Sequence, residues 1–199
     1  MSSPTVFVVD DDDAVRKAVA SAGGLLGYPV RSFHSAANFL AVYTPDQSGC
    51  LVLDVKMPGM TGLELQRRLA DDGVTLPVVM ISGHADVRIA VEAMTLGAVT
   101  LLEKPFSLDE LLAQVRKAIE RDATERASRG KADDVRAKLA ALTPKEREVM
   151  DQVVAGRTNR EIADSLGLSV RAVEDRRSRL MRRMGANSLA ELVALATQK

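Results

Sequence analysis

The residues best suited to chemistry in this 199-residue sequence each follow a short apolar run. Asp10 and Asp11 end one run, Asp54 ends another, and Ser82 and Lys104 end two more. Several carboxylates gathered in one place repel one another, and one would be protonated unless a cation joined them. A hard divalent ion such as Mg²⁺, or Mn²⁺ in its place, binds such oxygens and leaves room for a phosphoryl oxygen. A carboxylate can then attack phosphorus and form an acyl phosphate.

Asp54 is the expected nucleophile, because it stands alone at the end of a central apolar run. The ammonium group of Lys104 would neutralise the charge that develops on the phosphoryl group, and Ser82 would donate a hydroxyl hydrogen bond to it. An acidic run can also serve only to cap the helix that follows, and we retain that interpretation for Asp12 and Asp13.

These residues can meet only if the elements that carry them form one sheet. Apolar runs alternate with helical patterns over the first 120 residues, which favours a parallel sheet covered on both faces. The predicted strands are 5–9, 30–33, 50–53, 76–81 and 99–102, and the predicted helices are 14–26, 35–42, 61–71, 86–95 and 107–120. Five such units suit an open, doubly wound α/β sheet and are too few for an eight-stranded barrel. Ligands of open parallel sheets bind beyond the carboxyl ends of the strands, where these residues are expected.

The remainder of the chain is predicted to be wholly helical. Residues 123–138 are polar and charged, and we expect a linker there that can extend the preceding helix. It would separate two domains, residues 1–122 and residues 139–199. Capping boxes or a capping serine mark the helix starts at Thr143, Thr158, Ser169 and Ser188. The predicted helices are 144–155, 159–166, 170–184 and 188–197.

A short turn at 167–169 between two of these helices indicates a helix-turn-helix. Helix 170–184 has one apolar face, and its opposite face carries arginines that can bind phosphate or read guanine. A solvated, salt-bridged helix is the alternative interpretation, and the helical wheel does not decide between the two. Arg177 projects onto the apolar face, and we expect it to pair with a carboxylate such as Glu161 or Glu148. The candidate DNA-contacting residues are Arg171, Glu174, Asp175, Ser178, Arg179 and Arg182.

Charge and composition agree with two tasks for two parts of the chain. The net charge is zero, but the residues from Lys131 onward include 14 basic and 10 acidic side chains, so that part is basic and the rest is acidic. This asymmetry suggests that one part binds a cation and the other a polyanion. The single cysteine, Cys50, lies in an apolar run and is expected to be a buried thiol without a redox role. No signal-peptide pattern or long apolar span is present, so we expect a cytoplasmic protein with no membrane partner.

Four motifs, VVDDDDAVR, LVLDVKMPGMTG, MISGHAD and LLEKPF, resemble the receiver domains of bacterial two-component response regulators. The resemblance covers about residues 4–122 and implies a five-stranded sheet with the flavodoxin-like strand order. By this resemblance Asp54 is the phosphoacceptor, and Ser82 and Lys104 contact the phosphoryl group. The resemblance also implies a cis peptide bond between Lys104 and Pro105.

The same resemblance implies a magnesium site. Asp11 and Asp54 would bind the ion through their side chains, Lys56 would bind it through its backbone carbonyl, and Asp10 would bind mainly through water. A receiver of this type catalyses only its own phosphotransfer and slow dephosphorylation, so we do not expect an enzyme in the ordinary sense.

The segment from Leu142 to Val193 looks like the four-helix DNA-binding domain of the LuxR type. Together with the receiver, it makes the chain similar to the NarL/FixJ class, and in particular to FixJ-like regulators. In that class the third helix enters the major groove and the fourth helps dimerisation. Glu174, Asp175 and Ser178 fall where the class reads bases, and Asp175–Arg176 replaces the typical pair of an apolar residue and a histidine.

The predicted function is therefore that of a response regulator transcription factor. A sensor histidine kinase would phosphorylate Asp54 in a Mg²⁺-dependent reaction, and the phosphate would control dimerisation and binding to double-stranded promoter DNA. The phosphorylated chain is expected to form a homodimer, and RNA polymerase is a candidate further partner. Three other functions stay open: a constitutive DNA-binding regulator with a weakly coupled receiver, a phosphate sink, and a protein-interaction module.

Two features concern how the acyl phosphate would be used and how long it would last. Receivers usually carry a Tyr or Phe two or three residues before the lysine equivalent to Lys104, but residues 100–102 are Thr-Leu-Leu. This composition excludes a tyrosine rotamer switch and leaves the route from phosphate to DNA open. Lys56 and His84 lie near the acceptor, and we expect their bulk and charge to hinder the water that hydrolyses the acyl phosphate.

Overall fold

The computed structural model describes residues 3–83 and 86–197 of the chain. These residues form two compact units, an N-terminal unit that ends at Arg126 and a C-terminal unit that begins at Ala127. The division falls inside one long helix, within the segment that the sequence predicts to be a linker. Across the described residues, no helix combines the length and the apolar character needed to cross a membrane.

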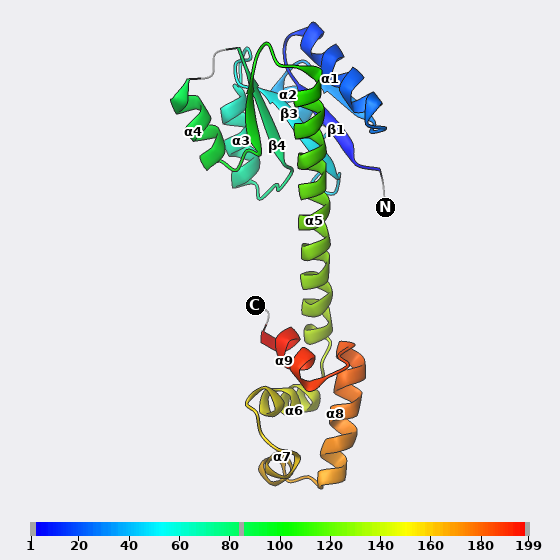
Figure 1. Cartoon of the computed structure of the whole chain (residues 1–199). Helices are drawn as coiled ribbons and strands as arrows, with labels where there is room; N and C mark the ends of the chain where they lie inside the picture. The colour runs from blue at the N-terminus through cyan, green and yellow to red at the C-terminus, as the bar shows by residue number, and fades with distance from the viewer. Residues whose placement is uncertain (1–2, 84–85, 198–199) are drawn as a thin grey trace. The chain divides into compact units, whose positions relative to one another are not determined.

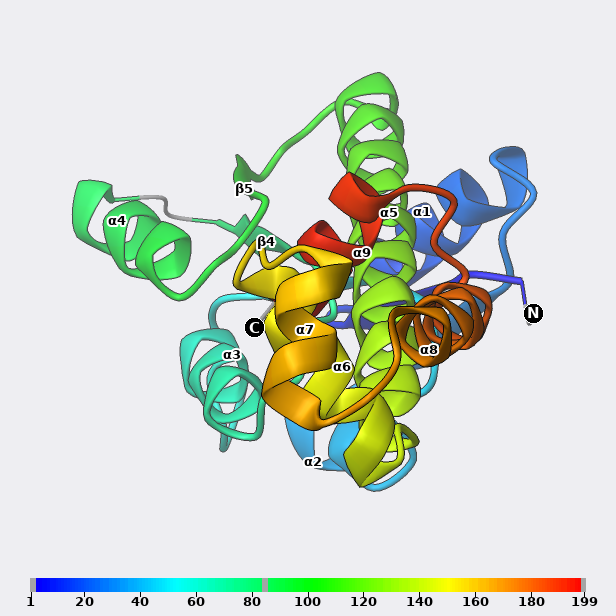
Figure 2. The same ribbon diagram turned by 90° about the horizontal axis from the view of Figure 1, so that it is seen from below.

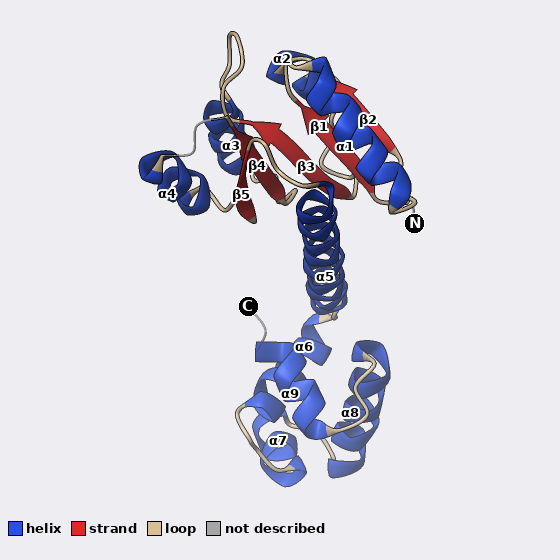
Figure 3. Cartoon of the chain, turned by 45° about the horizontal axis from the view of Figure 1, so that its top comes forward, coloured by secondary structure: helices blue, strands red, loops and turns tan. Residues whose placement is uncertain are grey.

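The N-terminal unit is a five-stranded parallel sheet in the order β2-β1-β3-β4-β5, which confirms the predicted fold class and strand order. Figure 3 shows the strands of this unit in red. The strands are β1 (Thr5–Val9), β2 (Val30–Phe33), β3 (Gly49–Asp54), β4 (Val78–Ser82) and β5 (Thr100–Glu103). The helices are α1 (Asp13–Leu25), α2 (Ala36–Leu40), α3 (Gly62–Asp71), α4 (Val87–Thr95) and the first part of α5 (Leu108–Ala140).

Alternation along the strands divides the core of this unit into two layers. Phe7 and Leu53 point to the face covered by α2, α3 and α4, whereas Val8 and Val52 point to the face covered by α1 and α5. Figures 1 and 2 show α3 and α4 on the opposite side of the sheet from α1 and α5. Both faces are covered, which explains why the strands have near-continuous apolar sequences.

Several predicted boundaries differ from the structure, and those of α5 and β4 have a clear physical cause. Helix α5 continues to Ala140, so the helix predicted over 107–120 extends through the linker, as the sequence allows. Its exposed surface carries ion pairs one turn apart, such as Arg121–Glu125 and Lys138–Asp134, which support a helix without packing. The fourth strand begins at Val78, after Pro77, which has no N–H for a strand ladder; the Pro77 carbonyl accepts a hydrogen bond from the Leu51 N–H.

The described part of the C-terminal unit is helical, with α6 (Pro144–Val154), α7 (Asn159–Leu166), α8 (Val170–Met184) and α9 (Leu189–Thr197) after the end of α5. Thr143 and Thr158 each form a capping box, as the sequence predicts. Gly167 ends α7 at a φ of 63°, a conformation that favours glycine, and it turns the chain toward α8. The apolar faces of the four helices enclose one core that contains Val149, Ile162, Val173, Leu180, Met184 and Leu192.

Candidate phosphoacceptor site and nucleic-acid interface

The polar residues that follow the strands lie along one edge of the sheet. Asp10 comes directly after β1, Asp54 ends β3, Ser82 ends β4 and Lys104 comes directly after β5. The strand register aligns them, because Val9 pairs with Leu53, Asp54 pairs with Ile81, and Ser82 pairs with Glu103. The carboxyl ends of parallel strands meet at the same edge, so residues up to 94 positions apart in sequence become neighbours.

Lys104 joins the two buried carboxylates of this edge. Its Nζ atom lies 2.8 Å from Oδ2 of Asp10 and 2.6 Å from Oδ1 of Asp54. Asp10 is fully buried and Asp54 is 4% exposed, whereas the Lys104 side chain keeps 23% of its surface exposed. The Lys104 N–H donates to the Ser82 carbonyl at 2.8 Å, and the Lys104–Pro105 peptide bond is cis, as expected. The lysine is therefore the cation that the crowded carboxylates require.

The protonation equilibria of this cluster reflect burial and charge together. Burial raises the pKa of Asp54 above its ordinary value, and the neighbouring charge of Asp10 adds to that rise. The Lys104 ammonium and the Lys56 N–H oppose the rise by hydrogen bonding to the ionised carboxylate. Burial by itself would lower the pKa of Lys104, but its hydrogen bonds to Asp10 and Asp54 outweigh burial and raise it. Lys104 therefore stays charged at neutral pH.

Backbone groups hold the acceptor strand end in place. The Lys56 N–H donates to Oδ2 of Asp54 at 2.7 Å, and the Asp12 N–H donates to Oδ1 of Asp10 at 2.8 Å. Gly62, the first residue of α3, packs so closely that a Cβ there would lie 2.0 Å from the Asp54 carbonyl oxygen. Arg16 donates from Nη1 to the Asp10 carbonyl at 2.7 Å. The sequence alone assigns no role to Gly62 or Arg16, although they end the motifs LVLDVKMPGMTG and VVDDDDAVR.

The oxygen donors of this edge suit a divalent cation only in part. Asp10 and Asp54 face each other across Lys104, but Asp11 is exposed. Within residues 3–83 and 86–197, no group of three or more Asp, Glu, His or Cys side chains is arranged to hold a metal ion. Each oxygen of Asp10 and Asp54 accepts a hydrogen bond and has a further lone pair for a metal ion. Two carboxylates, one backbone carbonyl and several waters fit Mg²⁺, which keeps much of its hydration.

The remaining residues near the edge have simpler roles. Asp12 caps α1 by accepting a hydrogen bond from the Ala14 N–H, and Asp13 pairs with Lys17 and Arg16, which supports the capping interpretation for both acids. Leu101 and Leu102 pack into the cores on opposite faces of the sheet. They occupy the stretch in which receivers usually carry the aromatic switch residue. Lys56 is exposed. His84 lies outside the described residues.

The outer face of α8 gathers the six candidate DNA-contacting residues. Arg171, Glu174, Asp175, Ser178, Arg179 and Arg182 are all exposed. Val173, Leu180 and Met184 are buried on the opposite side of the helix, as its apolar periodicity predicts. An open groove of about 630 Å³ lies beside the exposed face, and Glu174, Ser178, Arg182, Asn187, Ser188 and Leu189 are among its lining residues.

Two arginines of α8 fix it against neighbouring helices. Arg177 hydrogen bonds to the side-chain oxygen of Asn159 at the start of α7, so the predicted carboxylate partner is wrong. The carboxylate of Glu161 instead completes the capping box of α7. Arg183 contacts both carboxylate oxygens of Glu146 on α6, at 2.7 and 3.0 Å. The position of the exposed face is thus set by α6 and α7 together.

Both units of the chain match known protein families. Residues 6–116 match the response regulator receiver domain, and residues 140–196 match the luxR family of bacterial regulatory proteins. The transcriptional regulatory protein FixJ of Bradyrhizobium diazoefficiens is 41% identical over 96% of this chain and 93% of its own length. FixJ of Rhizobium meliloti is 42% identical over 98% and 96%.

The chain belongs to the FixJ-like response regulators. A solved structure of the response regulator StyR covers all of this chain and all of its own, with a TM-score of 0.91 and 37% identity. Full-length FixJ from B. japonicum covers 98% of this chain and 97% of its own, with a TM-score of 0.60 and 41% identity. This response regulator therefore combines a receiver with a LuxR-type DNA-binding domain, which agrees with a phosphorylation-controlled transcription factor.

Proposed function

We propose that Asp54 accepts a phosphoryl group from a sensor histidine kinase and that the modified chain then binds promoter DNA through α8. The observation that carries this proposal is the Lys104 ammonium, which lies 2.6 Å from Asp54 and 2.8 Å from Asp10 at the carboxyl edge of the sheet. A fixed cation beside a buried carboxylate at this edge is what phosphoryl transfer to that carboxylate requires.

The chemistry follows from the groups at the edge. A carboxylate oxygen of Asp54 forms a bond to phosphorus while the bond from phosphorus to the donor nitrogen of the kinase histidine breaks, and the nitrogen keeps the electron pair. Lys104 pairs with the phosphoryl oxygens, and the Ser82 hydroxyl donates to one of them. The product is an acyl phosphate, so the receiver catalyses its own phosphotransfer and its slow loss by hydrolysis.

A divalent cation is part of this proposal. Asp11 and Asp54 would hold Mg²⁺ or Mn²⁺ through their side chains and Lys56 through its backbone carbonyl, and Asp10 would act mainly through water. The bound ion would neutralise charge on the phosphoryl oxygens. The exposed position of Asp11 fits a ligand that completes the site from the solvent side.

The output of the proposed switch is DNA binding by the C-terminal domain. Arg171, Arg179 and Arg182 would contact phosphate or guanine, and Glu174, Asp175 and Ser178 would contact other base edges. The proposal includes a homodimer of the phosphorylated chain, because paired recognition helices bind paired half-sites. It also includes a cytoplasmic location, a receiver domain at 1–122, a linker at 123–138, a DNA-binding domain at 139–199, and RNA polymerase as a candidate further partner.

Duplex DNA selected by the full chain from a random library provides the probe for a direct test. The wild type and Asp54→Ala are titrated with this duplex after incubation with Mg²⁺ and acetyl phosphate, and again without acetyl phosphate. We expect the phosphodonor to raise the DNA affinity of the wild type and to leave that of Asp54→Ala unchanged. Equal affinities throughout would favour a constitutive regulator with a weakly coupled receiver. Phosphorylation without any DNA binding would favour a phosphate sink.

A salt titration separates DNA binding from a role as a protein-interaction module. Each phosphate contact releases counterions, so the logarithm of the DNA-binding constant should fall steeply with the logarithm of the salt concentration. A flat salt dependence would contradict the assignment of α8 as the DNA-contacting helix.

A further inference from the structure

Helix α5 contacts the start of the acceptor strand at the edge of the sheet opposite to the phosphoacceptor site. Gly49 begins β3, and its N–H donates to Oδ2 of Asp122 on α5 at 2.9 Å. Asp54 ends the same strand and contacts Lys104, which lies four positions before the first residue of α5. Strand β3 is therefore linked to α5 at one end, and at its other end to the short segment that leads into α5.

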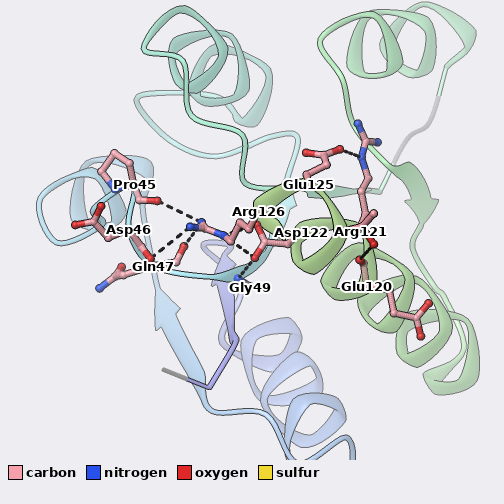
Figure 4. A network of polar contacts seen from close by, with 10 residues as sticks. Pro45, Asp46, Gln47, Gly49, Glu120, Arg121, Asp122, Glu125 and Arg126 are labelled. Atoms are coloured by element: carbon pink, nitrogen blue, oxygen red, sulfur yellow. Dashed lines mark hydrogen bonds and ion pairs between the residues drawn. The ribbon is translucent and has the colours of Figure 1, made fainter. Parts of the chain in front are cut away.

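Arg126 makes the contact at the start of β3 strong and specific. Its Nε atom lies 2.8 and 2.9 Å from the two carboxylate oxygens of Asp122. Its Nη2 atom donates to the carbonyls of Gln47 at 2.6 Å and Pro45 at 3.2 Å, and its Nη1 atom reaches the carbonyl of Asp46 at 3.4 Å. Figure 4 shows this guanidinium group between α5 and the loop that precedes β3. We call Asp122, Arg126 and the carbonyls of 45–47 the latch.

Because Asp122 is buried, breaking its ion pair with Arg126 alone is energetically unfavourable. Asp122 is 1% exposed, and a buried carboxylate that loses its cation is left uncompensated. The planar guanidinium group supplies several donors in a fixed geometry, which a single ammonium group cannot reproduce. The latch therefore holds α5 and the loop at 45–47 as one rigid contact.

The part of α5 that follows the latch is exposed. Residues 127–134, the next eight positions of the helix, are all exposed, and a Cβ at Gly130 would meet nothing within 4 Å. Glycine within an exposed helix is unfavourable by about 1 kcal/mol relative to alanine, so helical order in this segment depends on what precedes and follows it. Arg126 is the last residue of the N-terminal unit.

We propose that the latch is a positioning device that passes the state of Asp54 to the part of α5 beyond residue 126. The inference rests on the proposed function. It supplies a route from the phosphate to the DNA-binding domain, which an aromatic switch at residues 100–102 cannot supply because those residues are Thr-Leu-Leu. When Lys104 turns to the phosphoryl group, the start of α5 moves relative to the end of β3. Because the latch fixes α5 to the start of β3, that movement becomes a tilt of the helix. Without the latch, the loop at 45–47 would shift with this movement, and α5 would not tilt.

The full chain with Asp122→Asn and Arg126→Gln together tests the latch, because this double variant removes both charges and leaves none buried alone. The matched control is Arg121→Ala, which breaks the exposed Arg121–Glu125 pair on the same helix. Phosphorylation by acetyl phosphate is measured on phosphate-affinity gels. Hydrogen exchange in residues 127–140 and affinity for the selected duplex are measured with and without the phosphodonor.

We expect the double variant to be phosphorylated to the same extent as the wild type but to lose the phosphorylation-dependent changes. The gain in DNA affinity on phosphorylation, for which allosteric coupling is typically about 5-fold to 150-fold, should fall toward unity, and the control should keep it. A double variant that keeps both responses would overturn the latch. A wild type that is not phosphorylated, or whose DNA affinity ignores phosphorylation, would overturn the proposed function and the latch with it.

A second variant covers the case in which the double variant does not fold. Arg126→Lys keeps a positive charge beside Asp122 but cannot reach three carbonyls at once. We expect it to fold, to be phosphorylated normally and to show a smaller gain in DNA affinity than the wild type. A full wild-type gain in Arg126→Lys would contradict the role of the latch.

Discussion

The carboxyl edge of the sheet and the outer face of α8 both gather charged side chains, but they expose them differently. At the sheet edge, Asp10 and Asp54 are almost completely buried and share one ammonium group. On α8, all six candidate DNA-contacting residues are exposed. A buried charge depends on its partner, whereas an exposed charge is screened by solvent and adds little to stability. Substitutions at the edge should therefore change stability and chemistry together, and those on α8 should change only DNA binding.

The largest expected change in stability comes from Lys104→Met in the absence of divalent cations. This variant leaves two buried carboxylates without their shared cation, and we expect the free energy of unfolding to fall by roughly 3 kcal/mol. Urea denaturation of the full chain, followed by circular dichroism of the first transition, measures the loss. Lys56→Met, which removes an exposed side chain, is the control. An equal loss in both variants would show that the carboxylates do not depend on Lys104.

On α8, replacing a basic side chain should weaken DNA binding and leave the free energy of unfolding almost unchanged. Arg171→Ala and Arg182→Ala should each weaken binding to duplexes of any sequence if the arginine contacts phosphate, and should lower the slope of the salt dependence by about 1. Their free energies of unfolding should stay within about 0.5 kcal/mol of the wild type. Fluorescence anisotropy at several salt concentrations provides the measurement, with Arg136→Ala, an exposed arginine of α5, as the control. An unchanged salt slope in both variants would remove these residues from the phosphate contacts.

Cys50 is a buried side chain that carries no charge. Burial, with a smaller contribution from the charge of Asp122, raises the pKa of this thiol to about 12. The reactive thiolate is therefore scarce in the folded chain at pH 8. We expect iodoacetamide to label Cys50 only after unfolding in urea, as followed by mass spectrometry. Rapid labelling of the native chain would contradict the burial of this strand.

The smallest expected effect concerns the exposed capping box at Thr143. The Thr143 N–H and hydroxyl hold the pKa of Glu146 below its ordinary value of 4.5, with a contribution from Arg183. Because the folded pKa is lowered, this carboxylate stabilises the folded state above pH 4.5 and loses that effect as the pH falls through the folded pKa. The stability difference between Glu146→Gln and the wild type should therefore be present at pH 7 and shrink below pH 4.5. Thermal unfolding at a series of pH values tests this, and a difference independent of pH would contradict it.

Much of the phosphoacceptor site could be predicted because its logic is topological. Once alternating apolar runs indicate a parallel sheet, the residues that follow the strands must share one edge, and Asp10, Asp54 and Lys104 do so. Helical periodicity likewise separates the buried and exposed faces of α8. Both arguments use only the position of a residue within its own element, which the sequence states directly.

Contacts between elements could not be predicted in this way. Arg126 lies about 80 positions from the carbonyls that it contacts, and no pattern in the sequence couples them. The choice of Asn159 over a carboxylate by Arg177 also depends on how α7 and α8 pack.

The sequence by itself determined which residues can do chemistry and which edge of the sheet carries them, because residue type and strand order require no side-chain geometry. Only the tertiary structure decided which cation pairs with the buried carboxylates and at which residue of α5 the N-terminal unit ends. Lys104 pairs with Asp54, and Arg126 donates to the carbonyls of residues 45–47, because packing brings the ends of β3 close to these side chains. Such pairings depend on distances of a few ångströms between distant segments, and those distances exist only after the chain has folded.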